Sequence, residues 1–289
     1  MTRHFVALVL LFASFSLQAK VLFEGYYKLE VKGMHRGYMV IQHSLDEATN
    51  ERTFAYYMYK KVDQIVSQSG VTVTSTADFK PLRYKSVEWS GKDSVYIRGK
   101  FGPKGLELTK YNGRTNKVLE VLDDKPVPSM AIFSAMVSQV QAKNVNDYKE
   151  GYNVAFNALA EESSQFDHGE FKVLRQNPFG GQMIFQVLAI FMNEAFEFFT
   201  FRNGEIAGTR SDIQDQITYL VANRDEAVKD FPLNEVSLKT IFDAVPFGVT
   251  NNPVGQSNGA LNVKDAMRDF PLPSAKDRSP SSVTKTEKK

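Results

Sequence analysis

The feature that most constrains the fold is an alternation of apolar and polar side chains through the first half of the chain. Tyr27, Leu29 and Val31, for example, alternate with lysine and glutamate. Successive side chains on a strand point to opposite faces, so this period of two predicts half-buried strands. Turn signals such as the Asn-Gly pair at 112–113 separate these segments. The stretch 23–123 is therefore predicted to be a meander of antiparallel strands.

The second half of the chain mixes strand and helix signals. A helix is predicted over 129–142, where Ser129 supplies a cap and apolar residues recur at helical spacing. Two short helices are predicted near 223–245, with Asn223 and Asn234 at their starts. Strand-like segments occupy 152–161, 170–175, 181–191, 195–202 and 217–221.

Together these segments predict a mainly β fold of the β-rich α+β class. We expect a curved antiparallel sheet or half-barrel, with the 129–142 helix in or over its concavity and short C-terminal helices. Two smaller β-units, divided near residues 125–150, are an alternative. An outer-membrane barrel with lipid-facing strands is a third, but the interposed helices and the polar C-terminus disfavour it.

The N-terminus predicts export. Residues 1–19 combine a short basic start, an apolar run and Ala19 at a cleavage position, as in a secretory signal peptide. The alternative is an uncleaved anchor, but the apolar run is too short to span a bilayer comfortably. No transmembrane segment is expected after cleavage. Residues 20–249 are then predicted to form a β-rich periplasmic domain. Residues 250–289, rich in Asn, Gly, Pro and Ser, are predicted to be a mostly disordered polar tail.

The composition excludes several classes of function. The chain has no cysteine, which rules out disulfides, thiol catalysis, cysteine-bound metal and a lipid-modified cysteine. The formal net charge is +2, and loss of Arg3 with the signal lowers it to +1. This near balance gives no electrostatic case for a nucleic-acid partner.

One internal repeat stands out. Residues 223–233 recur as 262–272, with the Asn, the Ala and the final Asp-Phe-Pro-Leu identical. Convergence of capped helix ends on similar residues would explain the likeness. The alternative hypothesis is that the second copy docks where the first docks, on its own domain or on a neighbour.

The chemical motifs do not assemble a catalytic centre, a metal site or a cofactor site. The segment 255–259 matches the nucleophile-elbow pattern around Ser257, but it lies in the polar tail with no histidine after it. His35, His43 and His168 lack the compact spacing of metal ligands, so solvated or hydrogen-bonded histidines are expected.

Paired acids are the remaining chemical candidates. Adjacent carboxylates on a strand, such as Glu161 and Glu162, point to opposite faces and do not enter one cleft together. Solvated charges are expected at this pair and at Asp123-Asp124.

The apolar segment 181–202 is more informative. Apolar residues occupy both faces of its first strand, and a strand of this kind is buried on both sides. One side is expected to pack on a helix, while the other lines either a core or a cavity of lipid size. Phe185, Phe191 and Phe199 are the candidate ligand-binding residues.

Four segments carry a family resemblance, at residues 33–38, 77–84, 201–206 and 223–227. They resemble a widespread group of exported Gram-negative proteins known as periplasmic domains of unknown function. The resemblance spans roughly 22–248, and the group is similar in architecture to lipoprotein-carrier and lipid-carrier domains. It implies a curved antiparallel sheet around helices, and it implies no catalytic residues.

Three functional hypotheses follow. The first is a non-catalytic periplasmic protein that binds a lipid-like apolar ligand or an envelope partner. The second is a hydrolase of envelope material whose carboxylates meet only in space, which a deep acid-lined cleft would favour. The third is a structural assembly factor that uses the tail as a tether.

Overall fold

The computed structural model describes residues 19–90, 93–103, 105–110, 116–119, 148–161, 165–212 and 215–280. The predicted 129–142 helix and nearly all of the signal segment lie outside these residues.

The described part of the chain contains a single 14-stranded antiparallel sheet, in the order β8-β7-β6-β5-β4-β3-β2-β1-β14-β13-β12-β11-β10-β9. The predicted mainly β, curved antiparallel fold is thus confirmed. The strands are β1 (Lys20–Val31), β2 (Met34–Asp46), β3 (Glu51–Val62), β4 (Ile65–Thr76), β5 (Pro81–Ser90), β6 (Asp93–Gly102), β7 (Gly105–Lys110), β8 (Asn116–Leu119), β9 (Asn153–Ala160), β10 (Gln165–Phe179), β11 (Gln182–Phe191), β12 (Glu194–Phe201), β13 (Ile206–Ser211) and β14 (Gln216–Leu220).

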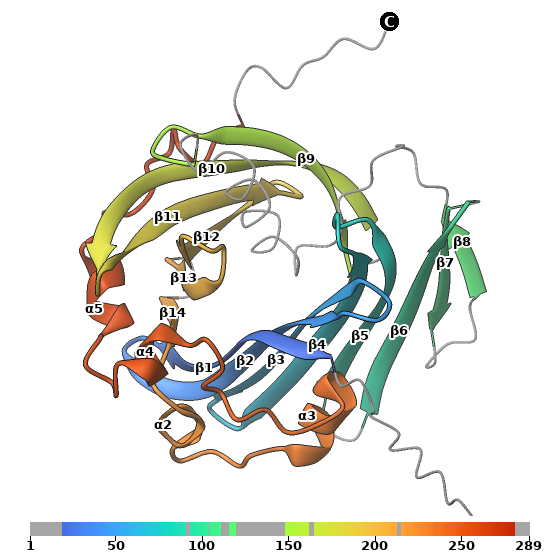
Figure 1. The fold of residues 1–289 in the computed structure, drawn as a ribbon, viewed down its shortest axis with the longest axis horizontal. Helices are drawn as coiled ribbons and strands as arrows, with labels where there is room; N and C mark the ends of the chain where they lie inside the picture. The colour runs from blue at the N-terminus through green and yellow to red at the C-terminus, as the bar shows by residue number, and fades with distance from the viewer. Residues whose placement is uncertain are drawn as a thin grey trace, which may run out of the picture.

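Pairing of the first strand with the last joins the two halves of the chain. Tyr27 of β1 lies opposite Leu220 of β14, and the ladder continues to Val31 opposite Gln216. The sheet curls into a barrel-like shape whose free edges are β8 and β9 (Figure 1). This continuity contradicts the alternative of two separate β-units.

Four short helices follow the sheet along the chain: α2 (Arg224–Val228), α3 (Glu235–Phe242), α4 (Pro253–Gln256) and α5 (Val263–Arg268). They lie along the outside of the curled sheet (Figure 1). Contacts join α2 to β1 and β2, α3 to β3 and β4, and α5 to β13 and β14. The predicted caps are confirmed, because Asn223 and Asn234 accept hydrogen bonds from the backbone N–H groups of Glu226 and Ser237.

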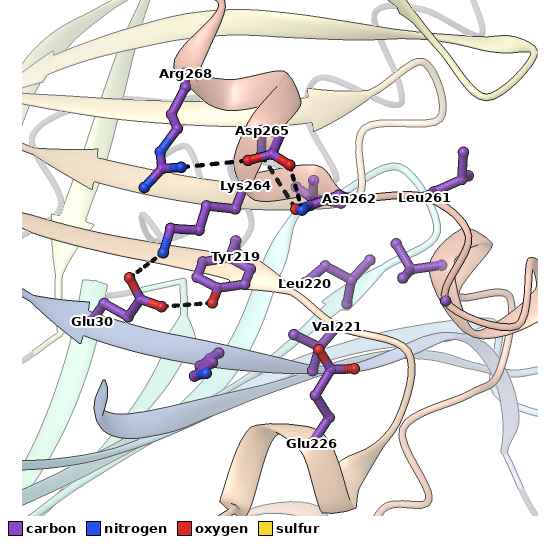
Figure 2. Close-up of a pocket in the computed structure, with 14 residues that line it drawn as sticks. Glu30, Tyr219, Leu220, Val221, Glu226, Leu261, Asn262, Lys264, Asp265 and Arg268 are labelled. Carbon is purple, nitrogen blue, oxygen red and sulfur yellow. Dashed lines mark hydrogen bonds and ion pairs between the residues drawn. The ribbon is translucent and has the colours of Figure 1, made fainter. Parts of the chain in front are cut away.

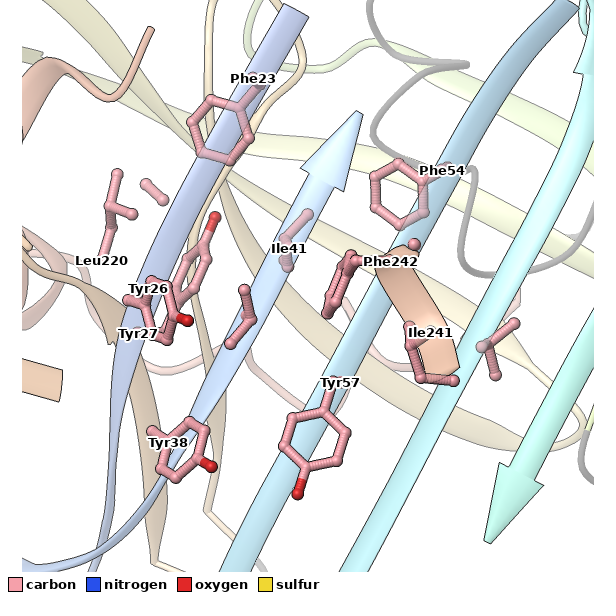
Figure 3. Packing of buried hydrophobic residues seen from close by; sticks show 14 of the residues in the cluster. Phe23, Tyr26, Tyr27, Tyr38, Ile41, Phe54, Tyr57, Leu220, Ile241 and Phe242 are labelled. Carbon is pink, nitrogen blue, oxygen red and sulfur yellow. The ribbon is translucent and has the colours of Figure 1, made fainter. Parts of the chain in front are cut away.

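Aromatic side chains fill the space beneath these helices. Tyr26, Tyr38 and Tyr57 are fully buried on neighbouring strands, and Ile241 and Phe242 of α3 are buried with them (Figure 3). The Tyr26 hydroxyl donates to the carbonyl of Pro246, and the Tyr38 hydroxyl donates to that of Pro232. Since buried tyrosine hydroxyls need partners, these bonds fix the segments that follow α2 and α3 on the outer face.

Residues 250–280 correct the prediction of a mostly disordered tail. They contain α4 and α5, and Val254, Val263, Met267 and Phe270 are buried in the core. The polar composition of this segment makes its few apolar residues easy to overlook. They are enough to dock the segment on the sheet, because the sheet already presents an apolar face for them to cover. The tail therefore belongs to the domain as far as residue 280, and residues 281–289 lie outside the described part.

The two copies of the repeat dock in equivalent ways on the outer face. Phe231 packs against His35 and Tyr59, and Phe270 packs against Phe199. The carbonyl that follows each phenylalanine accepts a hydrogen bond from a sheet side chain: Pro232 from Tyr38, and Pro271 from Gln186 and Arg210. The repeat is therefore a docking segment that is used twice, on β1 to β3 and on β11 to β14.

His35 connects the first copy to the sheet and predicts a pH dependence. Its Nε2 donates to the carbonyls of Gly37 (2.9 Å) and Ala227 (3.1 Å). Burial lowers the pKa of His35 below its ordinary 6.5, and Lys28 adds to this, while the two carbonyls and Asp230 act in the opposite direction. The unfolded chain then binds a proton more readily, so this stability is present above pH 6.5 and is lost as pH falls below that value.

We expect the melting temperature of the wild type to fall more steeply below pH 6.5 than that of His35→Gln. Glutamine keeps an N–H donor for the two carbonyls but does not titrate. Thermal denaturation followed by circular dichroism over this range tests the prediction. Parallel pH profiles for the two proteins would contradict it.

Candidate functional site

The inner face of the curled sheet carries an apolar pocket of about 400 Å³. It lies between β2 and β3 on one side and β11, β12 and β13 on the other. The alternation of each strand explains the lining, because every second side chain of these strands points to this face. The lining residues are Met39, Ile41, Phe54, Tyr56, Ala160, Glu161, Phe191, Met192, Glu194, Phe196, Phe198, Ile206 and Thr209.

The three candidate residues occupy three different environments. Phe191 lines the pocket. Phe185 lies on the same face of β11 but packs edge-on against Tyr148, with ring centroids 4.8 Å apart. Phe199 belongs to the opposite face, where it packs on Phe270 at 5.4 Å. The pocket therefore includes one of the three candidates, and the other two pack within the protein.

Sequence reasoning missed the opposite wall of the pocket. Met39, Ile41, Phe54 and Tyr56 come from β2 and β3, more than a hundred residues before β11. The signal was present as alternation along these strands, but alternation does not reveal which distant strand a face meets. That pairing depends on the curl of the sheet.

A hydrogen-bonded chain of polar groups joins β2, β3 and the turn before β13, and it was also missed. The Arg52 Nη1 atom is 3.4 Å from His43 Nε2, and His43 Nδ1 is 3.2 Å from Glu205 Oε1. Because a guanidinium can only donate, His43 Nε2 accepts and its Nδ1–H donates to Glu205. The His43 ring thus lies between the Arg52 guanidinium and the Glu205 carboxylate, with His43 and Glu205 both buried.

The other histidines and the motif serine have local partners. The ring of His168 contacts the side chain of Asn157, and His35 bonds to two carbonyls. Ser257 follows α4 rather than a strand, and its hydroxyl donates to the carbonyl of Val254. Among the described residues, no group of three or more His, Cys, Asp or Glu side chains is placed to hold a metal ion.

A second pocket, of about 430 Å³, lies on the outer face between α5 and strands β1 and β14 (Figure 2). Its lining is polar. Lys264 Nζ lies 2.5 Å from Glu30 Oε2, and the Tyr219 hydroxyl donates to Glu30 Oε1 at 2.7 Å. Burial raises the pKa of Glu30, but the hydrogen bonds from Lys264 and Tyr219 outweigh it and hold the pKa below its usual value. These groups satisfy one another and fasten α5 to the sheet.

The fold and the pocket define the class of protein. It is a barrel-like antiparallel β domain whose curled sheet stays open in the described residues, with an apolar pocket on its inner face and helices on its outer face. In the described part of the chain, no helix combines the length and apolar character needed to cross a membrane.

Comparison with known proteins gives matches only among solved structures, since no family model and no curated protein matches the chain. The chain is similar to a β-barrel-like protein of Domain of Unknown Function DUF1849 from Brucella abortus, with 13% identity, a TM-score of 0.49, and coverage of 68% of this chain and 94% of that chain. It is also similar to a DUF1089 family protein from Pseudomonas aeruginosa, with 10% identity, a TM-score of 0.36, and coverage of 62% and 91%. Neither description names an activity or a ligand.

Proposed function

We propose that this protein is a non-catalytic envelope protein that binds an apolar, lipid-like ligand on the inner face of its sheet. The observation that carries the proposal is the pocket, whose volume of about 400 Å³ falls in the range of small-molecule sites, roughly 300–1,000 Å³. Sites of this kind are lined mainly by hydrophobic and aromatic side chains with a few polar groups, as here. The signal-like residues 1–19 support an exported, periplasmic location.

The half-buried pocket phenylalanines Phe196 and Phe198 give the most direct test. Each contributes an aromatic ring to the pocket, and neither is fully buried, so glutamine at either site is expected to leave the fold intact. We expect Phe196→Gln and Phe198→Gln each to weaken binding of the neutral apolar dye N-phenylnaphthylamine by about 10-fold or more, as expected for the loss of a large apolar contact.

A fluorescence titration of the full chain measures this affinity. Phe247→Gln is the matched control, because Phe247 is 78% exposed and does not line the pocket. The proposal fails if the wild type does not bind the dye, or if the three variants bind it equally well.

A further inference from the structure

The ionisable side chains in the lining of the inner-face pocket are both acids. Glu161 and Glu194 line it with apolar and uncharged residues, and no lysine, arginine or histidine is among the described residues of the lining. Glu161 directly follows β9, and Glu194 begins β12, directly after the β11–β12 turn. Because β9 and β11 are both antiparallel to β10, they end at the same rim of the sheet. The pocket therefore has an acidic rim.

The two acids differ in their exposure to solvent. Glu161 is 2% exposed, whereas Glu194 is exposed. The interaction between two charges becomes stronger as the effective dielectric constant falls, so a buried carboxylate attracts a cation more strongly than an exposed carboxylate does. The same carboxylate repels an anion. The rim therefore favours a ligand with a positive head group over a ligand with a negative one.

Aromatic rings beside Glu194 add to this preference. Glu194, Phe196 and Phe198 are alternate residues of β12, so their side chains point to the same face of the sheet, and all three line the pocket. Phe191, at the end of β11, lies directly opposite Glu194 in the β11–β12 ladder. The face of a phenylalanine ring carries partial negative charge and attracts ammonium groups. Carboxylates and aromatic faces at one rim are the two kinds of group that recognise an organic cation.

We propose that the ligand of this pocket is an apolar molecule with a cationic, ammonium-type head group. The head faces the carboxylates of Glu161 and Glu194 and the rings of β12, and the hydrocarbon part lies against Ile41 and Phe54 of the opposite wall. This inference rests on the proposed function, because it names the ligand class of the same pocket.

The test compares three ligands with the same chain and different heads: decyltrimethylammonium, decyl sulfate and decanol. Each displaces N-phenylnaphthylamine from the full chain, at concentrations below those at which the ligands form micelles. We expect the wild type to bind decyltrimethylammonium about 10-fold or more tightly than decyl sulfate, because only the first carries the charge that the acidic rim attracts.

Glutamine variants of the two acids identify the source of this preference. Glu161→Gln is expected to weaken decyltrimethylammonium binding by about 10-fold or more, because its buried carboxylate is poorly screened. Glu194→Gln is expected to weaken it by about two- to fivefold, because interactions of exposed charges are small. Binding of decanol and of the dye is expected to change less than about twofold in both variants, because neither ligand is charged. Glu194→Gln serves if the buried variant does not fold.

Glu235→Gln is the matched control. It removes the same charge from the chain, but Glu235 is an exposed residue of α3 that does not line the pocket. Equal binding of the cationic and anionic ligands by the wild type overturns the cationic head, as does an affinity of Glu161→Gln/Glu194→Gln for decyltrimethylammonium equal to that of Glu235→Gln. In either case the apolar pocket stands if decanol and the dye still bind. Failure of all the ligands and the dye to bind overturns both proposals.

Discussion

Replacing Arg210 by methionine is expected to lower the free energy of unfolding by about 3–5 kcal/mol, because it leaves the buried Glu197 carboxylate without its cation. Arg210 Nε and Nη2 bind the two oxygens of Glu197 at 2.8 and 2.6 Å. The same guanidinium donates to the backbone carbonyls of Met267, Phe270 and Pro271. One side chain thus joins β13, β12 and the second copy of the repeat.

Urea unfolding of the wild type and variants measures this loss. Arg278→Met is the matched control, since its ion pair with Asp212 is more exposed and such pairs contribute about 0–1 kcal/mol. The double variant Arg210→Met/Glu197→Gln removes the stranded charge and is expected to regain part of the stability. Losses of equal size for Arg210→Met and Arg278→Met would contradict the assigned role of Arg210.

Replacing Phe270 by alanine is expected to cost about 3–5 kcal/mol, the usual range for removing a buried phenylalanine ring. Phe270 is 2% exposed and packs on Phe199, whose ring also lies 5.2 Å from the Arg210 guanidinium. Loss of this ring also weakens the hold of residues 262–272 on the sheet. We therefore expect faster cleavage by trypsin at Lys264 and Arg268 under native conditions, before the sheet itself is cut.

Leu272→Ala is the control within the same copy of the repeat, because Leu272 is 54% exposed and its loss is expected to be small. Denaturation curves give the stability of each variant, and limited proteolysis with mass spectrometry locates the first cuts. An unchanged midpoint for Phe270→Ala, or first cuts within the strands, would show that residues 262–272 do not depend on this anchor.

The candidate site shows how far local sequence patterns reach. Apolar residues on both faces of 181–191 predicted a strand buried on both sides, and all residues of β11 (Gln182–Phe191) except its first two are buried. The same pattern did not reveal which face would meet a pocket. Phe191 meets the pocket, whereas Phe199 meets the ring of Phe270, which is 71 residues further along the chain in a segment whose composition suggested disorder. The polar chain of Arg52, His43 and Glu205 could not be predicted either, since the curl of the sheet brings these residues together.

The sequence by itself determined most of the strands, their turns and the capped helices α2 and α3. These depend on the alternation of neighbouring side chains and on short-range hydrogen bonds such as those of Asn223 and Asn234. Only the tertiary structure decided that β1 pairs with β14, that residues 250–280 pack on the outer face, and that His43, Arg52 and Glu205 meet through hydrogen bonds. The physical reason is that burial is a property of the whole sheet. A few apolar residues in a polar segment become ordered only where a distant surface needs to be covered.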